Sequence, residues 1–165
     1  MPSSSTLGLV LSTEPAIVIS AENSPWIPMF EQQWFRLLRV LPNHSGYVAQ
    51  LKLAPGAAIP PHRHSGAVLA INLKGQRKLH TGEIINAGDF VYEPPGNVDT
   101  WQAIGNEDLI VHIHVMGDVE YLDEKGQVQS TYNARLMEAA YQKFCETQSL
   151  TPINLAECAG DCNEE

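Results

Sequence analysis

The chain has 165 residues, of which 44% are hydrophobic and 18% are charged, and its formal net charge is −9. This length suits a single domain with a real hydrophobic core. The acidic balance argues against binding to nucleic acids and to anionic membranes. No apolar run approaches the roughly 20 residues that a membrane-spanning helix needs.

Cysteine usage predicts a reducing compartment. The odd count of three, with Cys145, Cys158 and Cys162 clustered late in the chain, is unlike a disulfide framework. No lysine or arginine precedes Arg36, so we expect no secretory signal. The sequence therefore predicts a cytoplasmic protein. Cys158 and Cys162 could also bind a metal, although no second ligand pair accompanies them.

The predicted elements are mainly short strands. Residues 7 to 19 contain apolar runs and are predicted as an additional strand that could pair with another element of the chain or with a second subunit. Further strands are predicted at 34–41, 47–53, 67–73, 77–80, 84–85, 90–93, 98–104 and 109–116, with turn residues between them. Short strands at such spacing favour an all-β sandwich or barrel.

The apolar period changes after the last of these strands. From residue 133 to residue 148 it becomes helical, which predicts one amphipathic helix packed on the barrel. The apolar residues at this spacing are Leu136, Ala140 and Phe144, with Met137 and Tyr141 beside them. The predicted organisation is an N-terminal extension (1–24), a barrel (25–131), a helix (132–148) and an acidic tail (149–165).

His62 and His64, which are separated by one residue, form the most informative motif. Gly56 and the pair Pro60-Pro61 precede them and indicate a turn at the entrance of a strand. Alternate side chains of a strand share one face, so both imidazoles can converge on one metal ion. The alternative is a surface His-x-His that binds no metal.

A second segment joins a short strand, a Pro-Pro-Gly turn and an acidic residue at the start of another strand. It runs from Gly88 through Glu93 and Gly96 to Asp99. With the histidine segment and Gly75, it resembles the two motifs of the cupins: a Gly, five residues and His-x-His, then a Gly, five residues and Pro-x-Gly. This resemblance covers roughly residues 25 to 130. It implies a jelly-roll β-barrel, here with one C-terminal helix, that holds one divalent metal ion.

Three stretches resemble a subgroup of cupins more closely: 62–66, 91–96 and 121–126. They are similar to cupins related to 2,4'-dihydroxyacetophenone dioxygenase and acetylacetone-cleaving dioxygenase, and to the cupin domains of some anti-sigma factors. The resemblance implies a non-haem metal, most often iron, and in some members oxygen-dependent cleavage of a C–C bond. Cupins of this size usually pair, so a homodimer is expected.

The chain departs from the usual cupin ligands at two positions. Val68 occupies the place of the first-motif Glu, and Asp99 occupies the place of the second-motif His. In the dioxygenase subgroup the Glu of Tyr-Glu-Pro-Pro-Gly can complete the site, and Glu93 holds that place. The predicted metal ligands are therefore His62, His64, Glu93 and Asp99. Glu93 and Asp99 are also the predicted catalytic carboxylates, and Asp99 could act as a general base instead of a ligand.

A second His-x-His, His112 and His114, lies on the most strand-like run of the chain. The sequence leaves open which face of this strand looks into the barrel. These histidines are alternative ligands or hydrogen-bond donors to a ligand if they face inward, and they lie on an exterior face or at a subunit contact if they do not. His80 is a weaker candidate of the same kind. Tyr92, Trp101 and Met116 are candidate pocket walls, and the sequence leaves open which way they face.

Two functions follow from these patterns. Two histidines with one or two carboxylates suit non-haem Fe(II) oxygen chemistry, with Zn, Ni or Mn as alternative metals. The partners would be O₂ and a small dicarbonyl or hydroxyketone. The alternative function is a non-catalytic module that binds or senses a metal or small ligand. Val68 and Asp99 also leave open a metal-free barrel.

Overall fold

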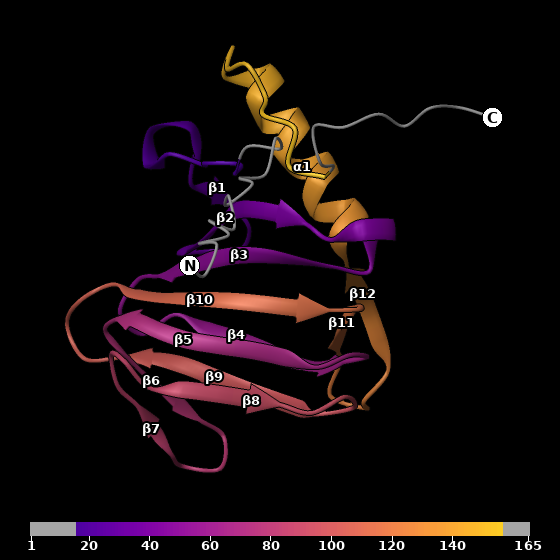
Figure 1. Ribbon diagram of the computed structural model, residues 1–165. Coiled ribbons are helices and arrows are strands. Elements are labelled where there is room, and N and C mark those ends of the chain that lie inside the picture. Colours follow the sequence, from indigo (N-terminus) through magenta and orange to yellow (C-terminus); the bar gives the residue numbers. More distant parts are fainter. Residues whose placement is uncertain (1–15, 157–165) are drawn as a thin grey trace, which may run out of the picture.

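The computed structural model describes residues 16–156, which form two facing antiparallel sheets, one α-helix and two short 3-10 helices, Ala21–Asn23 and Pro42–His44 (Figure 1). Within this part of the chain, each sheet has six strands. In spatial order, one sheet consists of β1 (Ile27–Pro28), β2 (Gln33–Val40), β3 (Gly46–Leu53), β10 (Leu109–Met116), β5 (Val68–Lys74) and β8 (Phe90–Glu93). The other consists of β12 (Val128–Tyr132), β11 (Val119–Leu122), β4 (Ala58–His64), β9 (Val98–Ile104), β6 (Gln76–Leu79) and β7 (Ile84–Ile85).

This arrangement confirms the predicted jelly roll, as two sheets that do not join into one closed barrel. β7 to β10 have the predicted bounds, and the strands predicted at 34–41, 47–53, 67–73 and 77–80 are found within one residue of theirs. One local detail differs. β7 and β8, which were predicted to flank a single turn, belong to different sheets. Asn72 spans the crossing, because its side-chain amide donates to the Ile85 carbonyl (3.0 Å) and its backbone carbonyl accepts from Gly88 (2.8 Å).

The core lies between the two sheets, where alternate residues of each strand meet. β10 illustrates the pattern: every odd-numbered residue from Leu109 to Val115 is buried, and the residues between them are partly exposed. Side chains of a strand alternate between its two faces, so a single register decides which set enters the core. The facing sheet contributes Ile59, Trp101, Ala103, Val119 and Tyr121.

The helix α1 (Ala134–Thr147) packs at the β2 end of the first sheet (Figure 1). The side chain of Asn133 caps it by accepting a hydrogen bond from the Leu136 amide (3.1 Å). The buried residues of α1 are Ala134, Met137, Tyr141 and Cys145. Leu136, the first residue of the predicted apolar stripe, is 43% exposed, so the buried face is shifted by one position.

The segment after the helix folds back and covers this face. The Tyr141 hydroxyl accepts from the Ile153 amide (2.9 Å), and the Leu155 carbonyl accepts from the Val40 amide (2.8 Å). Leu155 is buried, so part of the range expected as an acidic tail contributes to the core. Most of the strand expected at 7–19, together with Cys158 and Cys162, lies outside the described residues. No helix in residues 16–156 has both the length and the apolar character to cross a membrane.

Candidate metal centre

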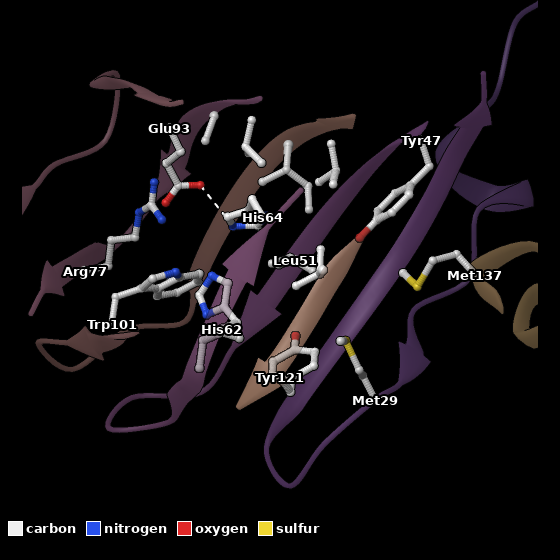
Figure 2. Close-up of a pocket in the computed structure, with 16 residues that line it drawn as sticks. Met29, Tyr47, Leu51, His62, His64, Arg77, Glu93, Trp101, Tyr121 and Met137 are labelled. Atoms are coloured by element: carbon white, nitrogen blue, oxygen red, sulfur yellow. Dashed lines mark ion pairs between the residues drawn. The ribbon is translucent and has the colours of Figure 1, made fainter. Parts of the chain in front are cut away.

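A cavity of about 50 Å³ lies between the sheets and has two unlike ends (Figure 2). His62, His64, Arg77 and Glu93 gather toward one end. Apolar side chains, with the hydroxyls of two buried tyrosines, form the rest of the lining. They include Met29, Tyr47, Leu51, Tyr121 and Met137. A polar cluster inside an otherwise apolar cavity is the usual form of a small-molecule site.

A bulge in β4 directs both histidines inward. Ile59 pairs with Trp101 and His62 pairs with Asp99, so the register shifts by one residue at Pro60-Pro61. Proline has no backbone N–H to give to the ladder, and bulges are where it is tolerated inside a sheet. The shift keeps Ile59 buried while it also places His62 on the inner face. Two residues further on, His64 follows on the same face.

His64 and Glu93 meet across the two sheets. Nε2 of His64 lies 3.4 Å from Oε2 of Glu93, and both side chains are buried (Figure 2). Burial lowers the pKa of His64 to about 4, with a smaller contribution from His62, so the imidazole is neutral at pH 7. Burial also raises the pKa of Glu93, an effect that the nearby Arg77 charge opposes. A neutral imidazole beside a carboxylate forms no strong ion pair, and both side chains are of types that can bind a metal.

His62 is oriented by its own strand. Its Nδ1–H donates to the Pro60 carbonyl (2.9 Å), which leaves Nε2 with a free lone pair. Burial lowers the pKa of His62, and this effect outweighs the Pro60 hydrogen bond and the Asp99 charge, which raise it. The rings of His62 and His64 pack edge to face with centroids 4.8 Å apart. Both imidazoles are therefore neutral, buried and adjacent.

The donor chemistry of His62, His64 and Glu93 fits a divalent metal. Two ligands about 2.1 Å from one ion stand about 3.0 to 3.4 Å apart, and the His64–Glu93 separation of 3.4 Å lies at the upper end of that range. Oε1 of Glu93 and Nδ1 of His64 are buried without hydrogen-bond partners, so neither side chain is committed elsewhere. Within residues 16–156, no three His, Cys, Asp or Glu side chains already surround one point. Metal binding would therefore require the His62 side chain to move toward His64 and Glu93.

Asp99 is buried opposite His62 but is engaged by other groups. Its Oδ1 accepts from the Thr100 amide (2.7 Å) and contacts Nδ1 of His80. Asp99 does not line the cavity, whereas the His80 side chain is 48% exposed. Of the four predicted ligands, the structure thus brings His62, His64 and Glu93 to the cavity and holds Asp99 beside it.

Arg77 is the residue that the sequence reasoning missed. Its side chain is buried, its Nε donates to Asn72 Oδ1 (3.1 Å), and its guanidinium lies 4.7 Å from the centre of the Trp101 ring. Arginine after a tight turn is ordinarily exposed, so no local pattern indicated burial. Only the pairing of Arg77 with Ala103, an inward position of β9, places it in the core.

The sequence matches the model of the ChrR cupin-like domain family over residues 14–120. The chain belongs to this cupin family. A search of curated proteins gave no significant match.

Solved structures give the same fold for this cupin. An RmlC-like cupin from Ralstonia eutropha superposes with a TM-score of 0.81 at 23% identity, covering 87% of this chain and 96% of that one. An acetylacetone dioxygenase from Acinetobacter johnsonii gives 0.68 at 19% identity, covering 82% and 95%. The anti-sigma factor ChrR, in its complex with SigE from Rhodobacter sphaeroides, gives 0.51 at 22% identity, covering 58% of this chain and 50% of that one. At these identities the likeness extends to the fold.

Several residues considered from the sequence face away from the cupin cavity. His112 and His114 share the outer face of β10, because Ile113 and Val115 occupy the inner one. Of the three candidate pocket walls only Trp101 lines the cavity. Tyr92 and Met116 alternate to the outside and are exposed, so they are not pocket walls. Val68 lines the cavity directly across from Glu93 in the β5–β8 pair.

Proposed function

We propose that this cupin is a metal-dependent dioxygenase that cleaves a C–C bond in a small dicarbonyl or hydroxyketone. The cross-sheet approach of His64 and Glu93 beside His62, at the polar end of an apolar cavity, is the observation that supports this most directly. His62, His64 and Glu93 would hold one divalent ion, with Fe(II) expected first and Zn, Ni or Mn as alternatives. When bound, the metal would supply Lewis acidity toward the substrate oxygens and redox chemistry toward O₂.

The protein's own residues would prepare the site. Two neutral imidazoles and one carboxylate leave coordination positions open, and the apolar lining excludes water from them. The general-base role of Asp99 stays a prediction. Thr100 and His80 engage its carboxylate beside the cavity, so it could reach a substrate proton only through a bridging group such as water.

The test begins with protein purified without chelators. Elemental analysis should give one divalent metal per chain, and oxygen uptake should follow addition of a 1,2- or 1,3-dicarbonyl from a panel. A fully Fe(II)-loaded protein that consumes no oxygen with any compound of the panel would contradict the dioxygenase proposal. Protein that binds no divalent metal would contradict the site itself.

A second candidate is a non-catalytic module that binds a metal or small ligand and contacts a protein. The match to the ChrR cupin-like family and the fold shared with ChrR favour this alternative. It predicts tight metal binding without oxygen consumption. The same oxygen-uptake experiment therefore separates the two functions.

Assembly and location stay predictions. We expect a homodimer and a cytoplasmic protein whose small-molecule substrate reacts with O₂. Sedimentation at micromolar concentration checks the first expectation, and a monomer there would contradict it.

A further inference from the structure

Arg77 is held rigidly at the polar end of the cavity. Only 2% of the residue is exposed. Asn72 accepts from its Nε, Trp101 lies under the guanidinium, and Arg77 lines the cavity together with Glu93 (Figure 2). A guanidinium fixed by one hydrogen bond and one ring still presents its two terminal nitrogens for a planar partner.

The charge of Arg77 is not matched by a direct partner. Nη2 is buried and makes no hydrogen bond, and Oε1 of Glu93 is also buried and unpartnered. No ion pair within 4.0 Å joins Arg77 to a carboxylate in residues 16–156. A buried, unpaired hydrogen-bond donor on a cation is costly, so such a group indicates a missing acceptor.

We propose that Arg77 binds a carboxylate of the substrate, so that the substrate class is a small oxo acid rather than a neutral diketone. This proposal deepens the function proposed for the site and rests on it for the reaction, but carboxylate binding by Arg77 needs no metal. A carboxylate would give Nη2 the acceptor that the protein does not supply.

The residues at the two ends of the cavity set the orientation of the rest of the ligand. Arg77, Glu93 and Trp101 lie at one end, and Tyr47, Met29 and Met137 at the other, with the two histidines between them (Figure 2). A carboxylate on Arg77 would bring the adjacent carbonyl toward the histidines and send an alkyl group toward the methionines. The small volume limits this alkyl group to a few carbons.

The test compares acetoacetate with acetylacetone, which has the same number of heavy atoms and a methyl group in place of one carboxylate oxygen. Binding to metal-free protein is followed by calorimetry at pH 7, so that chelation does not contribute. In the wild type, the affinity for acetoacetate should be at least about tenfold higher than the affinity for acetylacetone. A charge-assisted hydrogen-bonded pair in an apolar site contributes at least that factor. Equal affinities in wild type would overturn the proposal without any variant.

Arg77→Met should remove this preference and change acetylacetone binding by less than about threefold. Arg63→Met is the matched control, since Arg63 pairs with Glu120 on the outer side of the same sheet and should leave the preference intact. If Arg77→Met does not fold, Arg77→Lys is used, which keeps the charge and should lose most of the preference with the bidentate geometry. A preference that survives either folded variant would show that Arg77 only balances Glu93.

Metal content of the same samples separates the two proposals. Suppose that the protein is fully loaded with metal and consumes oxygen with neutral diketones, but shows no preference for a carboxylate. This result would contradict the proposed role of Arg77 and leave the dioxygenase proposal standing. If the protein prefers a carboxylate but binds no metal, the proposed role of Arg77 stands and the dioxygenase proposal is contradicted.

Discussion

The molecule contains the same short motif, His-x-His, on a strand of each sheet, with opposite outcomes. His62 and His64 of β4 are buried and line the cavity. His112 and His114 of β10 lie on the outer face of their strand, partly exposed. Residue type and spacing are identical in the two pairs. The face of the strand therefore separates a candidate metal site from two outward residues.

That face is set by register, and register is set by features outside the motif. In β4 the Pro60-Pro61 bulge shifts the pairing with β9 by one residue and directs the histidines inward. In β10 the apolar residues Ile113 and Val115 take the inner face and leave the outer face to the histidines. A one-residue slip in either strand would exchange these roles.

The largest expected effect is on metal affinity when the buried histidine pair is removed. Replacing His62 and His64 together with alanine should lower the affinity for a divalent metal by at least about a hundredfold, because imidazole provides the nitrogen donors of the site. The matched control replaces His112 and His114 together with alanine and should retain wild-type metal content. Elemental analysis and metal titration measure both. Loss of metal only in the control would move the site to the outer face of β10.

The pH dependence of stability should also differ between the two pairs. The pKa of His64 is about 4 in the folded protein and 6.5 in the unfolded chain. Between these values the unfolded state binds more protons, so the free energy of unfolding falls as the pH drops from about 6.5 to 4. The loss should reach about 3 kcal/mol in metal-free protein.

Urea unfolding at pH 7 and at pH 4.5 checks this prediction. His64→Gln should remove a large part of the difference in stability between the two conditions, and His62, whose pKa burial also lowers, should account for part of the remainder. The outer histidine His112 has a pKa lowered by partial burial and next by His114, but it is far less enclosed, so His112→Gln should leave most of the difference. An unchanged pH profile in His64→Gln would show that His64 is not the group that titrates.

A third prediction compares the two carboxylates near the inner pair. Glu93→Gln should weaken metal binding about tenfold or more, because Glu93 approaches His64 within the cavity. Asp99→Asn should change affinity less than Glu93→Gln, because Thr100 and His80 already engage Asp99. Titration with Mn(II) and Ni(II) measures both variants. A larger loss in Asp99→Asn would make Asp99 the metal ligand, as the sequence first suggested.

The smallest effect concerns the outer pair alone. His114 Nε2 is buried and has no hydrogen-bond partner, so His114→Leu removes an unsatisfied polar atom and should raise the free energy of unfolding by up to about 1 kcal/mol. Urea unfolding of the metal-free variant measures it. A loss above about 2 kcal/mol would show that His114 has a structural partner that the present contacts do not reveal.

Much of the fold followed from the sequence because its signals are local. Turn residues divided the chain into strands, and the spacing of Gly56, His62 and Gly96 carried the resemblance to cupins. The apolar period after residue 132 predicted the helix, although its buried face was shifted by one position. Such signals need only neighbouring residues to be interpreted.

The site was harder to predict because its parts come together through long-range pairing. The Arg77 side chain faces inward because β6 pairs with β9 in this register. The His112 side chain faces outward because of the way β10 pairs with β3 and β5. Both faces of β10 carry apolar residues, so alternation alone could not choose between them. The contact between His80 and Asp99 likewise joins residues from separate elements.

The segment after the helix has a consequence for how the molecule opens. Two hydrogen bonds hold this segment in place. The Val40 amide at the end of β2 donates to the Leu155 carbonyl, and the Ile153 amide donates to the Tyr141 hydroxyl in α1. Detaching the returning segment would expose the buried side of the helix and free the Val40 amide in the same event. The amides of Val40 and Ile153 should therefore show the same free energy of opening in hydrogen–deuterium exchange, as parts of a single cooperative unit.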